Sequence, residues 1–258
     1  MSPLRSEFRV DDEDRGAVRV LTLNRPDKLN AFTSQGYRAL TERLAAAAAD
    51  PNVAVCVLTG SGRAFSAGVD LTEMTEPGGK EALGASFDPL LAVLARFPKP
   101  LIAAVNGLAV GFGATILLHC DVVVVDEHAR IRLPFVELGT CAEAASSWLL
   151  PSRVGGQLAS WMVLSATTLS AGDALRIGLA LAQTPEGQVV EEAMVLAQQV
   201  AAHRVAALVA NKALLRNGWA DMIDEVWQRE KAAMMSLAEE LGSIGWSIGS
   251  TATHPDPG

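Results

Sequence analysis

Aromatic residues are scarce in this chain of 258 residues, since Phe, Trp and Tyr together supply only 5% of it. Any core must therefore be packed mainly by aliphatic side chains. Half of the residues are hydrophobic and 19% are charged, so the chain can bury a substantial core and is not expected to be disordered. Its length suits one large domain, or one domain with a small appendage.

Cysteines are few and odd in number, and no C-x-x-C pair occurs among Cys56, Cys120 and Cys141. Cys56 and Cys120 lie in or beside apolar runs, which predicts buried thiols rather than disulfides. This usage is typical of a reducing compartment, so we expect a cytoplasmic protein. Cys141 lies in a loop that we expect near a functional site, but a nucleophilic thiol needs a nearby base and the sequence identifies none.

Positive charge is also in deficit, with 21 Lys and Arg against 29 Asp and Glu and a net charge of −8. Binding a nucleic-acid backbone requires clustered cations, so no nucleic-acid partner is expected. The charged segment from Met1 to Asp14 has no apolar stretch typical of a signal peptide. The longest apolar runs, such as Leu101–Val105, are too short to span a bilayer, so no membrane partner is expected.

Several common site motifs are missing. No G-x-S-x-G elbow of a serine hydrolase is present. The four histidines form no metal-ligand spacing with one another or with the cysteines, so no metal is expected. A dinucleotide fingerprint requires G-x-G-x-x-G/A, but the motif that begins at Gly111 has Ile116 in the last position.

Short apolar runs alternate with helical patterns through the first half of the chain, which predicts a mostly parallel α/β sheet. The expected strands are 17–23, 53–58, 101–105 and 122–125, and the expected helices are 33–49, 88–96 and 114–119. Residues 76–80 are the best candidate for a mobile surface segment.

Helices are expected to dominate after Glu143, at 144–150, 155–164, 171–176, 186–202, 205–217 and 220–241. We place a boundary between an α/β core at 1–195 and a helical C-terminal region at 196–258, whose tail at 249–258 is expected to be disordered.

Two segments share the order buried strand, loop of small residues, helix start. One leads from the strand at 53–58 to Val69, and the other from the strand at 101–105 to Phe112. Ligands of parallel α/β sheets bind at the carboxyl ends of strands, where unpaired N–H groups can stabilise a developing oxyanion. Ordinary βα turns also contain glycine routinely, and spacing alone does not separate the two interpretations.

Three longer motifs identify a resemblance. Three segments resemble motifs of the crotonase (enoyl-CoA hydratase/isomerase) superfamily and occur in the same order. They are LNRPDKLNAF (23–32), AFSAGVDL (64–71) and AAVNGLAVGFG (103–113). Cys120-Asp121, Leu138-Gly139 and the segment 171–179 match in the same order, so the resemblance runs from about residue 18 to 180.

The resemblance implies a crotonase-like spiral of βαβ units with a helical C-terminal trimerisation region, assembled as a homotrimer or a hexamer. It implies acyl-CoA thioester substrates, with coenzyme A as part of the substrate rather than a cofactor. The N–H groups of Val69 and Phe112 would hold the thioester oxygen. The substrate-binding site would be lined by Lys28, Leu29, Ala67, Gly68, Asp70, Leu71, Gly111, Phe135 and Leu138. Lys28 is equally consistent with an ordinary exposed lysine in a turn.

Hydratases of this superfamily use two glutamates, but Thr115 and Phe135 stand at their places here. Neither side chain can activate water as a general base at neutral pH, so hydration by that mechanism is disfavoured. The segment 134–151 instead resembles peroxisomal-type Δ3,Δ2-enoyl-CoA isomerases, whose single base stands where Glu143 does. The resemblance therefore implies that Glu143 shifts a double bond from 3-enoyl-CoA to 2-enoyl-CoA.

Other interpretations stay open. Glu143 is expected where a helix begins, and a first-turn glutamate can be stabilised by the helix dipole without any catalytic role. That dipole would lower its pKa, whereas apolar surroundings would raise it. Glu137 is the second candidate base. The alternatives to isomerisation are hydration, another crotonase-type thioester reaction, or a catalytically silent subunit that binds acyl-CoA.

Overall fold

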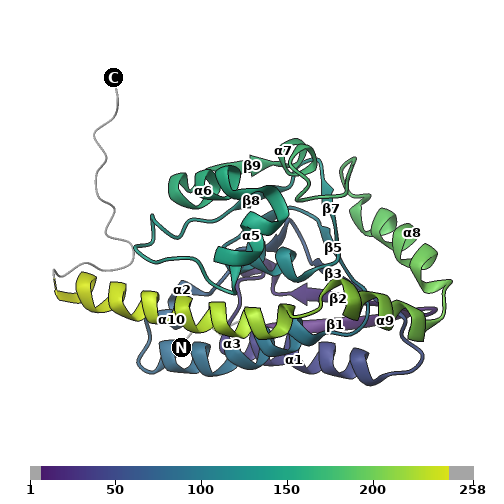
Figure 1. Ribbon diagram of the computed structural model, residues 1–258, viewed down its shortest axis with the longest axis horizontal. Coiled ribbons are helices and arrows are strands. Elements are labelled where there is room, and N and C mark those ends of the chain that lie inside the picture. Colours follow the sequence, from purple (N-terminus) through teal and green to yellow (C-terminus); the bar gives the residue numbers. More distant parts are fainter. Residues whose placement is uncertain (1–6, 244–258) are drawn as a thin grey trace.

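A computed structural model describes residues 7–243. The tail at 249–258, for which we predict disorder, lies outside the described residues. Two sheets form the α/β body, and the long helix α10 (Trp219–Ser243) runs along one side of it (Figure 1).

The larger sheet is mostly parallel, as predicted, and has the strand order β1-β2-β3-β5-β7-β10. Only β1 pairs in the antiparallel sense, with β2. The strands are β1 (Arg9–Arg15), β2 (Val18–Asn24), β3 (Val55–Gly60), β5 (Leu101–Val105), β7 (Val122–Asp126) and β10 (Ala182–Thr184). Strand β1 was not predicted, because it is an edge strand in which only Val10 is buried and the other side chains are mostly charged.

The smaller sheet was also not predicted. It has the order β4-β6-β8-β9, with strands β4 (Ala64–Ser66), β6 (Leu108–Val110), β8 (Arg130–Arg132) and β9 (Thr168–Ser170). Each strand has only three residues, which is too short for a hydrophobic period to reveal it. Strands β4, β6 and β8 follow β3, β5 and β7 along the chain, so the backbone steps repeatedly from one sheet to the other, and this confirms the predicted spiral.

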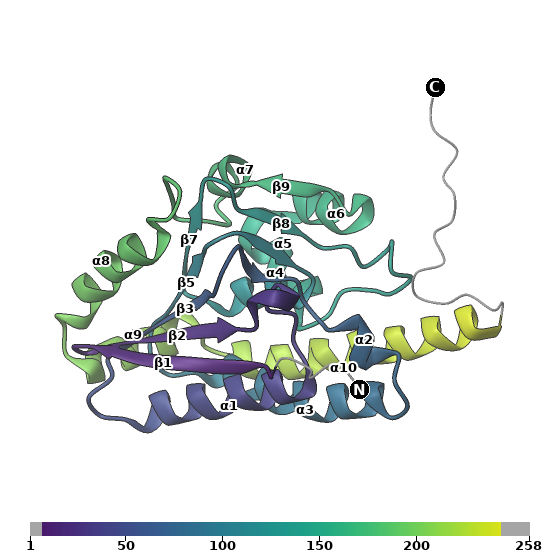
Figure 2. The ribbon, with the colours of Figure 1, turned by 180° about the vertical axis from the view of Figure 1, so that it is seen from behind.

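The apolar strands of the larger sheet are buried on both faces, and alternate residues face opposite layers. In β3, Cys56 and Leu58 face helices α1 (Ser34–Ala49) and α3 (Gly79–Arg96). Val55 and Val57 belong to the other layer, which α8 (Val189–Ala201) covers. Figures 1 and 2 show α1 and α3 together on one side and α8 on the other.

The remaining helices are short. They are α2 (Leu71–Met74), α4 (Phe112–Thr115), α5 (Ser146–Val154), α6 (Gly156–Ser165), α7 (Ala171–Arg176) and α9 (Val205–Leu215), with 3-10 turns at Pro26–Lys28 and Ile116–His119. Helix α3 begins at Gly79, nine residues earlier than predicted. Leu83 and Phe87 are buried side chains in the first turns of α3, and Pro89 lies near the middle of the helix rather than at its start.

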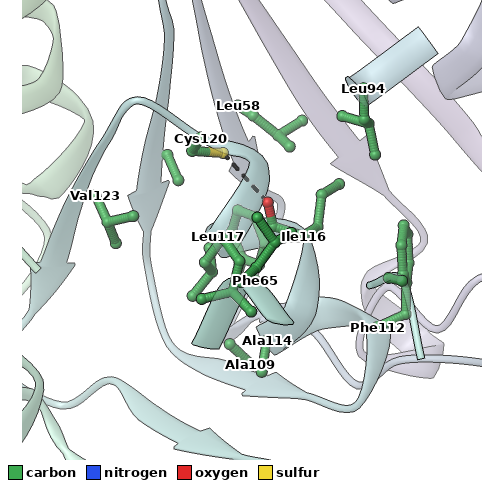
Figure 3. Packing of buried hydrophobic residues seen from close by; sticks show 14 of the residues in the cluster. Leu58, Phe65, Leu94, Ala109, Phe112, Ala114, Ile116, Leu117, Cys120 and Val123 are labelled. Atoms are coloured by element: carbon green, nitrogen blue, oxygen red, sulfur yellow. Dashed lines mark hydrogen bonds between the residues drawn. The ribbon is translucent and has the colours of Figure 1, made fainter. Parts of the chain in front are cut away.

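One concentration of aromatic side chains lies beneath the start of α4, although aromatics are scarce in the sequence. Their rings stack or meet edge to face, with centroids 4.9–5.3 Å apart, and they come from Phe8, Phe32, Tyr37, Phe87, Phe112 and Trp227. Phe112 contacts three of the others. Figure 3 shows the hydrophobic packing beside it, where Phe65, Ile116 and Leu117 lie close together. The backbone at Phe112 is therefore held in a rigid setting.

No single helix in residues 7–243 is both long and apolar enough to cross a membrane. Taken together, helices α8 and α9 have the length and apolar composition of a membrane-spanning segment, but the chain bends by 104° between them.

Candidate active site

The loop after β4 presents one of the two predicted oxyanion donors. Phe32 and Val69 form an isolated parallel bridge, in which the N–H of Phe32 donates to Gly68 O at 2.6 Å and the N–H of Asp70 donates to Phe32 O at 2.8 Å. In such a bridge the hydrogen bonds use the groups on either side of the bridging residue. The N–H of Val69 therefore points away from Phe32 and is not used by the bridge.

The second predicted donor lies at the start of α4. Gly111 precedes the helix with φ 53° and ψ −123°, and its carbonyl accepts from the N–H groups of Ala114 and Thr115 at 2.9 Å. Phe112 is the first helical residue, and the first N–H groups of a helix have no acceptor within it. The N–H of Phe112 is thus available to a ligand.

The two loops meet at their glycines. A Cβ at Gly68 would lie 2.6 Å from Val110 O and 3.4 Å from Phe112 N. A Cβ at Gly111 would lie 4.0 Å from Gly68 Cα and 3.9 Å from Oε1 of Glu143. Only glycine permits this approach at Gly68, and both positions have positive φ. The structure therefore brings Val69, Phe112 and the Glu143 carboxyl group to one place.

Glu143 does not begin a helix, which corrects the predicted helix at 144–150. Ala144 and Ala145 both adopt the left-handed conformation with φ 58°, and α5 starts only at Ser146. The left-handed backbone conformation in this turn costs about 1–3 kcal/mol for each non-glycine residue. Such strain persists only where the surroundings enforce it, and it is common at functional sites.

The electrostatic setting of Glu143 decides a question that its sequence position leaves open. Burial, and to a lesser extent the nearby charge of Glu230, together raise the pKa of the Glu143 carboxyl group to about 7. Desolvation therefore outweighs any effect of a helix dipole. Glu143 is half-buried as a residue. A carboxyl group that titrates near neutral pH suits general base catalysis.

Glu137, the second candidate base, has a different setting. It lies in the turn after β8, and both of its carboxylate oxygens accept from Arg132 Nη2, at 2.5 and 2.6 Å. Its side chain is 49% exposed. Glu137 is therefore an exposed carboxylate that is already paired with Arg132.

The two positions of the hydratase glutamates carry no ionisable group. Thr115 is fully buried in α4, and its hydroxyl donates to Phe112 O at 3.4 Å. Phe135 is also buried and belongs to the main core. Leu138, by contrast, is only half-buried. Cys141 has a thiol whose pKa is raised by burial and by Glu230, which disfavours a reactive thiolate.

Asp70, predicted to line the substrate-binding site, stabilises the local structure. Its carboxylate forms a buried ion pair with Arg25 at 2.6 Å and accepts from the N–H groups of Thr72 and Glu73 at the start of α2. Burial acts to raise the pKa of Asp70, but these partners hold it below its usual value. The pair connects the 3-10 turn at Pro26–Lys28 with the loop that carries Val69.

Asn30 reinforces the same connection and was not singled out from the sequence, although it lies in the motif at 23–32. It is fully buried with φ 55°. Its amide donates to Ala64 O at 2.8 Å, and its carbonyl oxygen accepts from the N–H of Arg25 at 2.8 Å. The amide group therefore holds β4 against the preceding turn.

Three further predicted binding residues lie at the open edge of this loop pair. Lys28 is exposed and Leu71 is 41% exposed. The N–H of Ala67 donates at 2.9 Å to the carbonyl of Leu29, a fourth predicted binding residue, and both are half-buried.

Within residues 7–243, no group of three or more His, Cys, Asp or Glu side chains could hold a metal ion.

Comparison with known proteins gives the family. A family model described as enoyl-CoA hydratase/isomerase matches residues 13–241. The chain is 43% identical over 235 residues to a 2,3-dehydroadipyl-CoA hydratase of Escherichia coli, covering 91% of this chain and 88% of the relative. It is 36% identical over 201 residues to a 1,2-epoxyphenylacetyl-CoA isomerase of the same species, covering 76% of each.

A crystal structure of an enoyl-CoA hydratase/isomerase from Pseudoalteromonas atlantica superposes with a TM-score of 0.84 at 32% identity, covering 89% of this chain and 91% of that one. These relatives carry the names of hydratases and of a CoA isomerase, so the likeness is to the superfamily and not specifically to the peroxisomal-type isomerases. The chain belongs to the crotonase, or enoyl-CoA hydratase/isomerase, family of enzymes.

Proposed function

We propose that this enzyme shifts the double bond of a 3-enoyl-CoA to give a 2-enoyl-CoA, with Glu143 as the single base. The observation that carries this proposal is the setting of Glu143, whose carboxyl group has a pKa of about 7 beside the two glycine loops. Thr115 and Phe135 supply no carboxylate that could activate water in its place.

The reaction needs one base and no water. The Glu143 carboxylate removes a proton from C2, and the electron pair moves into a dienolate that extends from the thioester oxygen to C4. The N–H groups of Val69 and Phe112 stabilise the negative oxygen, because they are fixed before the charge develops. The protonated Glu143 then returns its proton to C4, which leaves the double bond between C2 and C3.

The coenzyme A portion is proposed to lie along the open edge of the same loops. Lys28, Leu29, Ala67 and Leu71 lie there, and Gly68 and Gly111 keep the backbone close to the thioester. Phe135 and Leu138 are proposed to bound the acyl end, with Leu138 the more accessible of the two.

We also propose that the enzyme is a cytoplasmic homotrimer or hexamer. Its three cysteines are free thiols, as suits a reducing compartment. Several large apolar side chains are exposed on α6 and α9, namely Trp161, Leu164, Leu214 and Leu215, and apolar patches of this kind are typical of subunit contacts. Light scattering of the purified protein would give the subunit number.

Hydration is the second candidate, because the 43% identical relative is named a hydratase. One assay compares the two, with 3-enoyl-CoA and 2-enoyl-CoA offered separately to the wild type, to Glu143→Gln and to Glu137→Gln. We expect isomerisation of 3-enoyl-CoA, a loss of about 10²–10⁴-fold in Glu143→Gln, and little change in Glu137→Gln.

Isomerisation that survives in Glu143→Gln would contradict the proposed base. Hydration of 2-enoyl-CoA at a comparable rate would favour the hydratase. Tight binding of both acyl-CoA compounds without turnover of either would indicate a catalytically silent subunit.

A further inference from the structure

The peptide unit that joins Ala144 to Ala145 is held from two opposite sides. The carbonyl of Ala144 lies 2.9 Å from Nε2 of His119. The N–H of Ala145 donates to Oε2 of Glu230 at 2.7 Å. These two groups belong to one trans peptide plane and point in opposite directions. The orientation of that plane is set directly after Glu143, in the middle of the strained left-handed turn.

His119 supplies the first contact from the 3-10 turn that continues α4. A carbonyl oxygen only accepts hydrogen bonds, so Nε2 must carry the proton. Burial lowers the pKa of His119 to about 4, and the charges of Arg216 and Arg153 act in the same direction, so the ring is neutral at pH 7. The backbone of His119 is itself fixed, because its carbonyl accepts from Arg216 Nη2 at 2.9 Å.

Glu230 supplies the second contact from the middle of α10. It is 5% exposed, and its other oxygen, Oε1, accepts from the N–H of Ser147 at 2.8 Å. Its carboxylate thus binds two N–H groups at the beginning of α5. Hydrogen bonds from two backbone N–H groups stabilise the charged form of a buried carboxylate, and they do so only while the carboxylate stays within reach of both donors.

We propose that His119 and Glu230 are positioning residues that clamp the Ala144–Ala145 peptide and so hold the Glu143 carboxyl group against the two oxyanion donors. The inference rests on the proposed function, in which Glu143 is the base. Two consecutive left-handed alanines would relax if either contact were lost, because their conformation is disfavoured for residues with a Cβ. Relaxation there would rotate the backbone that carries Glu143.

The clamp also places a negative charge beside the base. The ionisable groups around Glu143 are Glu230 on α10, Tyr37 on α1 and Cys141 in its own loop, and Arg229 partly offsets the charge of Glu230. Tyr37 and Cys141 are uncharged at neutral pH, because burial raises the pKa of each. Burial raises the pKa of Glu230 as well, whereas its hydrogen bonds with the N–H groups of Ser147 and Ala145 favour its ionised form. Ionised Glu230 raises the pKa of Glu143, so removal of its charge should lower the pKa of Glu143.

The test uses the whole chain, four variants and Glu143→Gln as a reference for assignment. Glu230→Gln removes the charge and one acceptor, His119→Leu removes the donor, and His119→Gln retains an N–H donor. Glu239→Gln is the matched control, since this exposed carboxylate lies on the same helix. Two quantities are measured as functions of pH, namely kcat and KM for 3-enoyl-CoA, and the titration of the Glu143 carboxyl carbon by NMR, assigned by its absence in Glu143→Gln.

We expect kcat to fall by about 10–100-fold in Glu230→Gln and in His119→Leu while KM changes little, because a small misplacement of a catalytic group has an effect of this size. His119→Gln should retain most of kcat, and Glu239→Gln should match the wild type. The NMR midpoint of Glu143 should move to lower pH in Glu230→Gln and stay in place in Glu239→Gln.

An unchanged kcat and an unchanged Glu143 midpoint in folded Glu230→Gln would overturn the proposal for that residue. Equal losses in His119→Gln and His119→Leu would overturn the donor role of His119, and this pair also decides the matter if Glu230→Gln does not fold. Absence of wild-type turnover would instead contradict the proposed function, while the NMR titration, which needs no substrate, would still test the clamp.

Discussion

Oε1 of Glu143 lies 3.9 Å from the point that a Cβ at Gly111 would occupy. This places the carboxyl group directly beside the residue whose following N–H, that of Phe112, is one of the proposed oxyanion donors. A thioester bound between them would have its oxygen near α4 and its C2 near the base. Proton abstraction next to a carbonyl requires this relation between base and oxyanion donor.

Gly111→Ala should therefore impair catalysis more than folding. The methyl group would enter the space beside Glu143, and the backbone at φ 53° and ψ −123° is unfavourable for alanine by about 1–3 kcal/mol. We expect kcat/KM to fall at least about tenfold, with a lower melting temperature. Gly84→Ala is the matched control, because Gly84 lies within α3 and a Cβ there would meet no atom within 4 Å.

That control should be neutral or slightly stabilising, since alanine favours a helix by about 1 kcal/mol over glycine. A Gly111→Ala enzyme with normal kcat/KM would show that no reacting group lies beside Gly111.

The raised pKa of Glu143 predicts how stability varies with pH. Its pKa rises from 4.5 to about 7 on folding, so the folded state binds the proton more tightly than the unfolded state does. This contribution is fully present below about pH 4.5 and is lost as the pH rises through 7. The difference amounts to at most roughly 3 kcal/mol, because solvent contact at the site weakens it.

Glu143→Gln should accordingly stabilise the protein more at pH 8 than at pH 5. Thermal unfolding of both proteins at the two pH values measures this directly. The activity of the wild type should rise as the pH passes about 7, where its stability falls, because the base must be ionised. Equal stabilisation at both pH values would contradict the raised pKa.

The Arg25–Asp70 pair is expected to stabilise the loop that carries Val69. Asp70→Asn removes the carboxylate charge that the buried Arg25 guanidinium contacts at 2.6 Å, and it weakens the start of α2. We expect a loss of roughly 3 kcal/mol in the free energy of unfolding, as is usual when one partner of a buried pair is removed. Chemical denaturation measures it.

Asp224→Asn is the comparison, because Asp224 pairs with Arg96 in an exposed setting, with side chains 50% and 48% accessible. Exposed pairs contribute little, so this variant should change stability by less than about 1 kcal/mol. Similar losses in both variants would show that burial does not distinguish the two pairs.

Much of the fold could be predicted because its strands are long apolar runs separated by helical patterns. Strands β3, β5 and β7 are buried on both faces, so their composition alone indicates a parallel sheet. The three-residue strands of the smaller sheet and the charged edge strand β1 carry no such pattern, and they form only through tertiary pairing.

The candidate site could be predicted in part, because the pattern of buried strand, loop and helix start indicates the segments that lead to Val69 and Phe112, and the family resemblance indicates Glu143. Glu230 could not, since it lies 85 residues from Ala145 and its role depends on how α10 packs against α5. His119 reads locally as one residue of an apolar run, and only the structure shows its ring reaching Ala144. Contacts across such distances leave no periodic signal in a single sequence.

Proton return by a single base predicts the fate of an isotopic label. A 3-enoyl-CoA that carries deuterium at C2 should give a 2-enoyl-CoA with part of that deuterium at C4, because Glu143 both removes and returns it. Bound substrate covers the carboxyl group, which slows exchange with water. Mass spectrometry of the product, made in ordinary water, measures the transferred fraction. Hydration followed by dehydration would place only solvent hydrogen at C4, so product with no deuterium there would contradict the single-base route.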